Sequence, residues 1–376
     1  MKHTSIGRIA ALATTAMLAF AACSSSGGSS PSAAASAAAP SVAAPSVAAS
    51  AAASAAAGAS GSAAAANPNL NIVFIPKAIS NPYFDAAATG GQKAATELGG
   101  QFKQIGSTDS TTAAQIPFIQ DAVTQGYKAI AVSATGADEV APALKDAMAA
   151  GIKVVGYDSS PAEGAYNVFV NQTDFSLIGG SMAQWACDLA PNCTGDIAIL
   201  SATATATNQN AWIKDMNTAL KDPKFAGLKL VDTVYGDDNP QTSTTQAQGL
   251  LQKYPNLKVI VAPTTVGILA AAKVVKDTAG SKVKVTGLGL PNDMKPYVAA
   301  DGITPKFGLW SVPDLGYLTY YVAAKLITGE IKGTVGETFT VPNLNNGQPY
   351  TIGPKNTVIL GPPFVFDASN INNFNF

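Results

Sequence analysis

The stretch IVFIPKAISNPYFDAAATGGQKAATELG, residues 72–99, carries the pattern that decides the fold. Its first four residues are apolar and predict a buried strand, and residues 83–98 predict a helix. Lys77 and Asn81 lie between them, where the strand ends. Charged side chains are rarely buried without a partner, so a lysine at this junction marks a candidate functional position.

The same alternation of apolar runs and helical segments continues along the chain. The expected strands are 72–75, 101–105, 129–132 and 153–157, then 196–200, 228–235, 259–262 and 283–287. The expected helices are 83–98, 111–124 and 137–149, then 178–187, 210–220, 242–253 and 266–277. Strands this apolar, separated by helices, are typical of parallel sheets covered on both faces. The sequence therefore predicts an α/β protein with two doubly wound parallel-sheet lobes.

The first 67 residues differ in composition from the rest. Residues 1–22 place Lys2 and Arg8 before an apolar stretch and small residues, the order of a secretory signal peptide. Cys23 follows directly, which predicts a lipidated cysteine, with simple cleavage and secretion as the alternative. Residues 23–67 are almost entirely Ala, Ser, Gly and Pro and predict a disordered tether. We therefore expect an extracytoplasmic protein anchored to the cell membrane as a lipoprotein.

Two further cysteines, Cys187 and Cys193, are close together in the sequence. In an oxidising exterior they can pair as a disulfide, and two free thiols are the alternative. A metal site built on them is disfavoured because histidine is absent nearby.

Missing residue types exclude several classes of function. The sole histidine is His3 and the sole arginine is Arg8, both in the predicted signal peptide. Histidine-based catalysis and zinc sites are then not expected, and neither is recognition of an anionic ligand by arginine. A net charge of −1 gives no indication of nucleic-acid binding. We expect no cofactor, no metal and no enzymatic activity, although hydrolysis by a carboxylate pair stays formally open.

Polar and aromatic residues gather after the expected strands, at the ends where parallel sheets bind ligands. These positions belong to motifs that run in order through the chain: FIPK, NPYF, GYDS, VNQTDFSLIGG, LSATATATNQNAWI, TVYGDD, VAPTTVGILAAA, VTGLGLPNDM and FGLW. On these motifs the chain, from Asn71 to Phe376, resembles the type I periplasmic sugar-binding proteins, the solute receptors of ABC importers. Its closest resemblance is to their rhamnose-binding and autoinducer-2-binding branch.

The resemblance implies two lobes joined by three crossovers, near residues 172–175, 307–311 and 340–344. It assigns 68–173 plus 310–341 to the N-terminal lobe and 174–309 plus 342–376 to the C-terminal lobe. It also implies a monomer that delivers its ligand to an ABC permease with a cytoplasmic ATPase.

In the N-terminal lobe the candidate ligand residues are Lys77, Asn81, Tyr83, Phe84 and Asp158. Aromatic rings can stack on a sugar's C–H face, and amide, ammonium and carboxylate groups match its hydroxyls. Each residue also has a structural interpretation. Lys77 could pair with a carboxylate, one of the two rings could anchor the helix in the core, and Asp158 could cap a turn.

Further candidates lie at the crossovers and in the second lobe: Asn171, Gln172, Asn208, Gln209, Pro263, Thr265 and Trp310. Asn171 and Gln172 could equally bind the crossover backbone, and Asn208 could be a helix cap. Trp212 is expected in the core.

The ligand expected from the resemblance is a neutral monosaccharide, with rhamnose or a similar deoxyhexose favoured. The autoinducer-2 receptors that the chain resembles carry aspartate where this chain has Asn208, and alanine where it has Thr265. An amide donates as well as accepts, so this difference should change which hydroxyls are satisfied. The alternatives are an autoinducer-2 receptor or a sugar sensor with a signalling partner. A glycosidase would need a second carboxylate across the cleft, and the export signal disfavours a DNA-binding repressor of the same fold.

Overall fold

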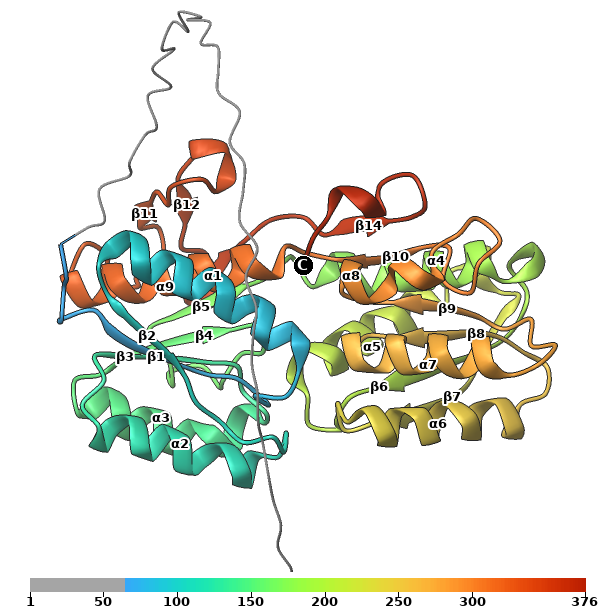
Figure 1. The fold of residues 1–376 in the computed structure, drawn as a ribbon, viewed down its shortest axis with the longest axis horizontal. Helices are drawn as coiled ribbons and strands as arrows, with labels where there is room; N and C mark the ends of the chain where they lie inside the picture. The colour runs from blue at the N-terminus through green and yellow to red at the C-terminus, as the bar shows by residue number, and fades with distance from the viewer. Residues whose placement is uncertain (1–64) are drawn as a thin grey trace, which may run out of the picture. The chain divides into compact units, whose positions relative to one another are not determined.

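The computed structural model describes residues 65–376, and Figure 1 shows their arrangement. The expected signal peptide 1–22, the lipidated Cys23 and nearly all of the tether 23–67 lie outside the described residues. Within 65–376, no helix combines the length and apolarity needed to cross a bilayer. The same residues contain no cluster of three or more His, Cys, Asp or Glu arranged to hold a metal ion.

The first lobe is built on a six-stranded parallel sheet in the order β13-β5-β4-β3-β1-β2. Its strands are β1 (Asn71–Ile75), β2 (Gln101–Gln104), β3 (Ala129–Val132), β4 (Lys153–Tyr157), β5 (Val168–Asn171) and β13 (Thr357–Ile359). Its helices are α1 (Pro82–Leu98), α2 (Thr112–Thr124), α3 (Ala137–Ala149) and α9 (Val312–Thr328). In Figure 1, α1 and α9 cover one face and α2 and α3 the other. The central strands are buried on both faces, as their continuous apolar runs predict.

The second lobe has a four-stranded parallel sheet in the order β7-β6-β8-β9. Its strands are β6 (Gly195–Ser201), β7 (Leu228–Tyr235), β8 (Leu257–Ala262) and β9 (Lys284–Gly287). Its helices are α4 (Ser176–Leu189), α5 (Thr207–Ala219), α6 (Pro240–Lys253), α7 (Thr265–Asp277) and the short α8 (Pro291–Met294). Helix α4 packs on α5, and α6 packs on α7. The expectation of two doubly wound α/β lobes is confirmed.

Close packing of α1 against α9 depends on two glycines. A Cβ on Gly90 would meet the backbone oxygen of Pro313, and a Cβ on Gly316 would meet that of Ala87. Helix α1 begins at an N-cap, Asn81, whose Oδ1 accepts a hydrogen bond from the Tyr83 backbone N–H at 3.0 Å. The close packing holds the first half of α1 against the start of α9.

The chain passes from one sheet to the other three times. It leaves the first lobe after β5, at 172–175, and returns at 310–311, between β10 (Phe307–Leu309) and α9. Strand β13 pairs with β5, whereas β14 (Phe364–Phe366) pairs with β10 beside the second sheet. The third passage is therefore at 360–363, and the expected crossover near 340–344 is wrong. Residues 357–359 are part of the first sheet, although the resemblance implies that all of 342–376 belongs to the second lobe.

The minor elements lie outside the two sheets. Strands β11 (Thr338–Phe339) and β12 (Tyr350–Thr351) form a small antiparallel pair.

Cys187, in α4, forms a disulfide with Cys193, which confirms the pairing interpretation over free thiols.

Candidate functional site

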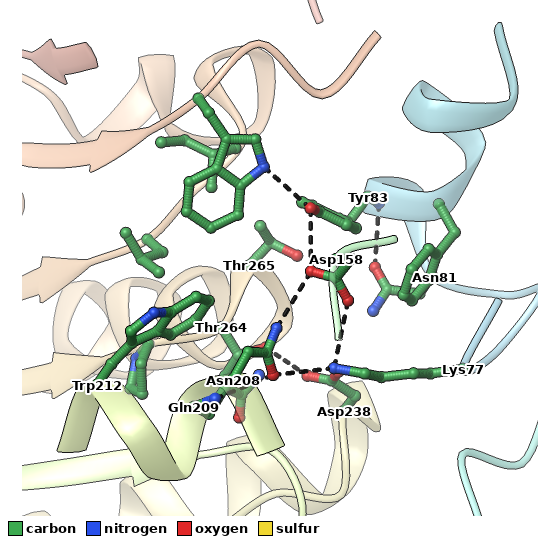
Figure 2. Close-up of a pocket in the computed structure, with 15 residues that line it drawn as sticks. Lys77, Asn81, Tyr83, Asp158, Asn208, Gln209, Trp212, Asp238, Thr264 and Thr265 are labelled. Atoms are coloured by element: carbon green, nitrogen blue, oxygen red, sulfur yellow. Dashed lines mark hydrogen bonds and ion pairs between the residues drawn. The ribbon is translucent and has the colours of Figure 1, made fainter. Parts of the chain in front are cut away.

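A cavity lies where the strand ends of the two lobes meet, and Figure 2 shows the residues around it. The space between its atoms amounts to about 340 Å³, including the part open to solvent. The lining residues come from both lobes: Lys77, Asn81, Tyr83, Phe84, Asp158, Asn208, Gln209, Trp212, Asp238, Pro263, Thr264, Thr265, Leu288, Leu309 and Trp310. Most of these residues directly follow a parallel strand or open the helix after it, which is where such sheets place ligand groups. Ten of the twelve candidate residues border this single space.

Asp158 is the centre of the polar network. It follows β4 with φ of 59°, a left-handed conformation that aspartate tolerates better than most residues. Its carboxylate is contacted by Ser133 Oγ at 2.7 Å, Tyr83 OH at 3.1 Å, Asn208 Nδ2 at 3.2 Å, Lys77 Nζ at 3.3 Å and Gln172 Nε2 at 3.5 Å. Every one of these groups can donate, so the carboxylate acts here as an acceptor only.

Lys77 contacts both lobes. Besides its ion pair with Asp158, its ammonium donates to Asn208 Oδ1 at 3.1 Å. The pairing of Lys77 with a carboxylate, one of the two interpretations of this residue, is thus present in the structure. Asn208 in turn donates to Asp158, so its amide connects α5 of the second lobe to β1 and β4 of the first (Figure 2).

Aromatic side chains form the apolar part of the wall. Trp310 Nε1 donates to Tyr83 OH at 2.9 Å, and the Tyr83 hydroxyl donates onward to Asp158. Burial, and then the charge of Asp158, hold the pKa of Tyr83 well above its usual value, so the phenol keeps its proton. Phe84 packs edge-on against Tyr83 and against Tyr157, at ring separations of 5.1 and 6.2 Å. Both α1 rings border the cavity and also belong to the core.

The second lobe contributes an amide, Gln209, whose orientation is fixed by hydrogen bonds from the end of β6. Gln209 Oε1 accepts from Ser201 Oγ and from the Ala202 backbone N–H, each at 2.9 Å. This leaves the Nε2 end of the amide available to another acceptor. Pro263 and Thr265 lie at the end of β8 and the start of α7 and border the same space.

Asp238 is a lining residue that the sequence analysis missed. It follows β7 and has φ of 50°, and the preceding Asp237 also has positive φ, 56°. The Thr264 hydroxyl donates to its carboxylate. Burial raises the pKa of Asp238, Asp158 adds to the increase, and Thr264 and Lys77 oppose it. The strand-end rule applied to the other strands would have found it, because TVYGDD places two aspartates directly after a strand.

Residues 72–331 match the model of the periplasmic binding protein domain. The chain belongs to the periplasmic binding protein family. Its relatives are sugar-binding receptors of ABC transporters, as the resemblance of its motifs predicts.

Three similar proteins illustrate the range of ligands in this family. A solute-binding protein from Clostridium phytofermentans, solved with bound L-rhamnose, is 38% identical with a TM-score of 0.78, over 83% of this chain and 98% of that one. LsrB from Clostridium saccharobutylicum, solved in complex with AI-2, is 25% identical with a TM-score of 0.75, over 81% and 99%. The D-ribose/D-allose-binding protein of Pseudomonas aeruginosa is 25% identical over 60% of this chain and 72% of its own length.

Two candidate residues of this binding protein lie away from the cavity. Asn171 and Gln172, at the first crossover, are buried but do not border the space. Asn171 serves the crossover through its backbone, whose oxygen accepts from Leu360 N–H at 2.8 Å, and Gln172 approaches the site only through Asp158. Trp212, which is not among the candidate ligand residues, is in the core as expected and also borders the cavity.

Proposed function

We propose that this protein is the extracytoplasmic receptor of an ABC importer and binds a neutral monosaccharide, preferentially L-rhamnose or a similar deoxyhexose. The observation that carries the proposal is the position of Asn208. Its amide meets Lys77 and Asp158 of the opposite lobe inside the cavity. A ligand held by groups from both lobes is fully bound only when the lobes are together, so binding favours the closed form.

A neutral ligand is supported by the charges around the cavity. Lys77 and Asp158 already pair with each other, and burial raises the pKa of Asp238 and so favours its neutral form. No arginine is present beyond residue 8 to hold a carboxylate or phosphate in two hydrogen bonds. A sugar's hydroxyls can both donate and accept, which suits the mixture of amide, ammonium, hydroxyl and carboxylate groups in the wall.

A deoxyhexose is supported by the apolar part of the same wall. Leu288 and Leu309 border the cavity together with Tyr83, Phe84 and Trp310. A C-methyl group placed against such side chains is removed from water, whereas a hydroxyl there would lose its hydrogen bonds. The L-rhamnose-bound structure from Clostridium phytofermentans, at 38% identity, favours the same ligand class.

The AI-2-bound LsrB supports an alternative, an autoinducer-2 receptor or a sugar sensor that presents its closed form to a signalling partner. Asn208 and Thr265 weigh against this alternative, because the autoinducer-2 receptors that the chain resembles have aspartate and alanine at these positions.

A glycosidase is a further alternative, because Asp238 supplies the second carboxylate that such an enzyme would need. Five donor groups already contact the Asp158 carboxylate, which leaves its oxygens little room to activate a water or to attack a sugar carbon.

The proposal includes transport and anchoring. The closed receptor docks on a membrane permease driven by a cytoplasmic ATPase, and it works as a monomer. A lipid on Cys23 and the tether 23–67 keep it near that permease, which raises its effective concentration there without changing its affinity for the sugar.

The experiment is a thermal-shift screen of the protein against L-rhamnose, L-fucose, D-ribose, D-xylose, D-galactose and an autoinducer-2 preparation, followed by calorimetry. We expect the largest stabilisation with L-rhamnose, and no measurable binding by Asp158→Ala. Asp121→Ala, which changes an exposed aspartate on α2, is the matched control and should bind like the original chain. Stabilisation by autoinducer-2 alone, or full binding by Asp158→Ala, would refute the proposal.

A further inference from the structure

Trp212 has a buried hydrogen-bond donor without a partner. It lies in the second turn of α5 with 2% of its surface exposed, and it borders the cavity. Its indole Nε1 makes no hydrogen bond within residues 65–376. Buried polar atoms in proteins are nearly always paired, so each exception calls for an explanation.

The second tryptophan of the cavity provides an internal comparison. Trp310 Nε1 is paired with Tyr83 OH at 2.9 Å, although the two indole rings lie only 5.7 Å apart. One indole N–H therefore organises the wall, and the other has no such role. An indole N–H can only donate, so its missing partner must be an acceptor.

The ring of Trp212 is held firmly enough to fix the position of this donor. Phe175 packs against it nearly perpendicularly at 5.3 Å, and Trp310 covers it at an angle of 52°. In Figure 2 the ring lies beside Asn208 and Gln209 at the edge of the space enclosed by the labelled residues. The donor thus belongs to a rigid part of the wall, which is the arrangement expected of a group that selects a ligand by geometry.

The side-chain oxygens of Asn208 and Gln209, about one turn earlier on α5, are already occupied. Leu288 and Leu309 are apolar lining residues, Asn208 Oδ1 accepts from Lys77 and from the Gln209 backbone, and Gln209 Oε1 accepts from Ser201 and Ala202. An acceptor on a bound ligand would supply the partner that the Trp212 N–H lacks.

We propose that Trp212 Nε1 donates a hydrogen bond to one oxygen of the bound sugar, which makes Trp212 a specificity-determining residue. The inference rests on the proposed function, because it requires a sugar in this cavity. A sugar that has an oxygen at that position pairs the donor, and an analogue without it leaves the donor buried and unpaired. The site therefore distinguishes sugars by the presence of one particular oxygen.

The test compares Trp212→Phe with the original chain by calorimetry, using L-rhamnose and its monodeoxy analogues. Phenylalanine keeps an aromatic ring and removes the N–H, so we expect L-rhamnose to bind about tenfold more weakly or worse. One monodeoxy analogue, which lacks the paired oxygen, should bind the two proteins with equal affinity. Unchanged affinity for L-rhamnose, or an equal loss for every analogue, would overturn the inference.

A second measurement detects the donor directly in the original chain. The chain has three tryptophans, so indole ¹⁵N labelling gives three N–H signals, which single Trp→Phe variants assign. Addition of L-rhamnose should move the Trp212 signal downfield more than that of Trp310, whose N–H is already paired. An unmoved Trp212 signal in a protein saturated with sugar contradicts the inference while leaving the proposed function intact. Failure of the original chain to bind any sugar of the panel overturns the proposed function, and the inference with it.

Discussion

Ser110→Ala should weaken sugar binding although Ser110 lies outside the cavity. The Ser110 hydroxyl, just before α2 in the first lobe, donates to the backbone oxygen of Asp237 in the second lobe at 2.8 Å. The variant removes a contact that joins the two lobes and leaves every lining residue unchanged. Its effect should therefore act through the equilibrium between open and closed forms.

The magnitude follows from that single bond. A typical hydrogen bond contributes about 0.5 to 1.5 kcal/mol net, which corresponds to an approximately two- to tenfold change in an equilibrium constant. If the open form predominates without sugar, the dissociation constant rises by the factor by which the closed population falls. A bond between the lobes must break when they separate, so the loss should appear as faster dissociation with little change in the association rate.

Calorimetry and stopped-flow fluorescence with L-rhamnose measure these quantities. Ser80→Ala is the matched control, because the Ser80 hydroxyl donates to Thr108 of its own lobe at 3.4 Å. It should leave both rates unchanged. An affinity for Ser110→Ala equal to that of the original chain, or an equal loss in both variants, would refute the link between this contact and closure.

Two further predictions concern the elements that hold the cavity. In Gly316→Ala the new Cβ meets the Ala87 oxygen, so the free energy of unfolding should fall by about 1 to 3 kcal/mol in a urea titration. Sugar affinity, measured by calorimetry, should fall with it. The control is Gly249→Ala on α6, where open space surrounds the new Cβ, and it should be neutral or stabilising. Asp238 has a raised pKa in the folded protein, so its contribution to stability is complete below its unfolded pKa of about 3.9 and is lost as the pH rises through the folded value. Asp238→Asn should flatten the part of the fall in melting temperature that the Asp238 carboxyl adds as the pH rises above about 4, and an unchanged pH profile would contradict this.

The sequence predicts the sheets well for a definite physical reason. Strands such as β3 and β4 are buried on both faces and read as short, continuous apolar runs between helices. The ends of β1 and β4 then place Lys77 and Asp158 at one edge of the sheet, because parallel strands present their carboxyl ends together. Strand β13 cannot be predicted in this way. Its three residues carry too little pattern to identify a strand, and pairing with β5, far away in sequence, determines its place.

The two missed features of the cavity have different causes. Asp238 lies in a run of residues that also suits an ordinary turn: the strand-end rule marks the run TVYGDD, and the fold adds that Asp238 faces Thr264 and the cavity. Trp212 occupies an apolar position of an amphipathic helix, where sequence alone indicates core packing. The structure shows that a side chain can be packed on one edge and border a binding site on another. A pattern of hydrophobicity assigns each residue only one of these roles.

The amide at position 208 lets the two lobes meet at Asp158 without bringing two carboxylates together. Asn208 Nδ2 lies 3.2 Å from one carboxylate oxygen, while its Oδ1 accepts from Lys77. Two carboxylates at that separation would repel by about 5 kcal/mol at an effective dielectric constant near 20. Attraction to Lys77 would offset much of this, but the burial of another charge would still cost several kcal/mol. The amide avoids both costs, because it donates to Asp158 and accepts from Lys77 at once. A sugar hydroxyl has the same dual capacity, so it can take over either contact without leaving a buried charge unpaired.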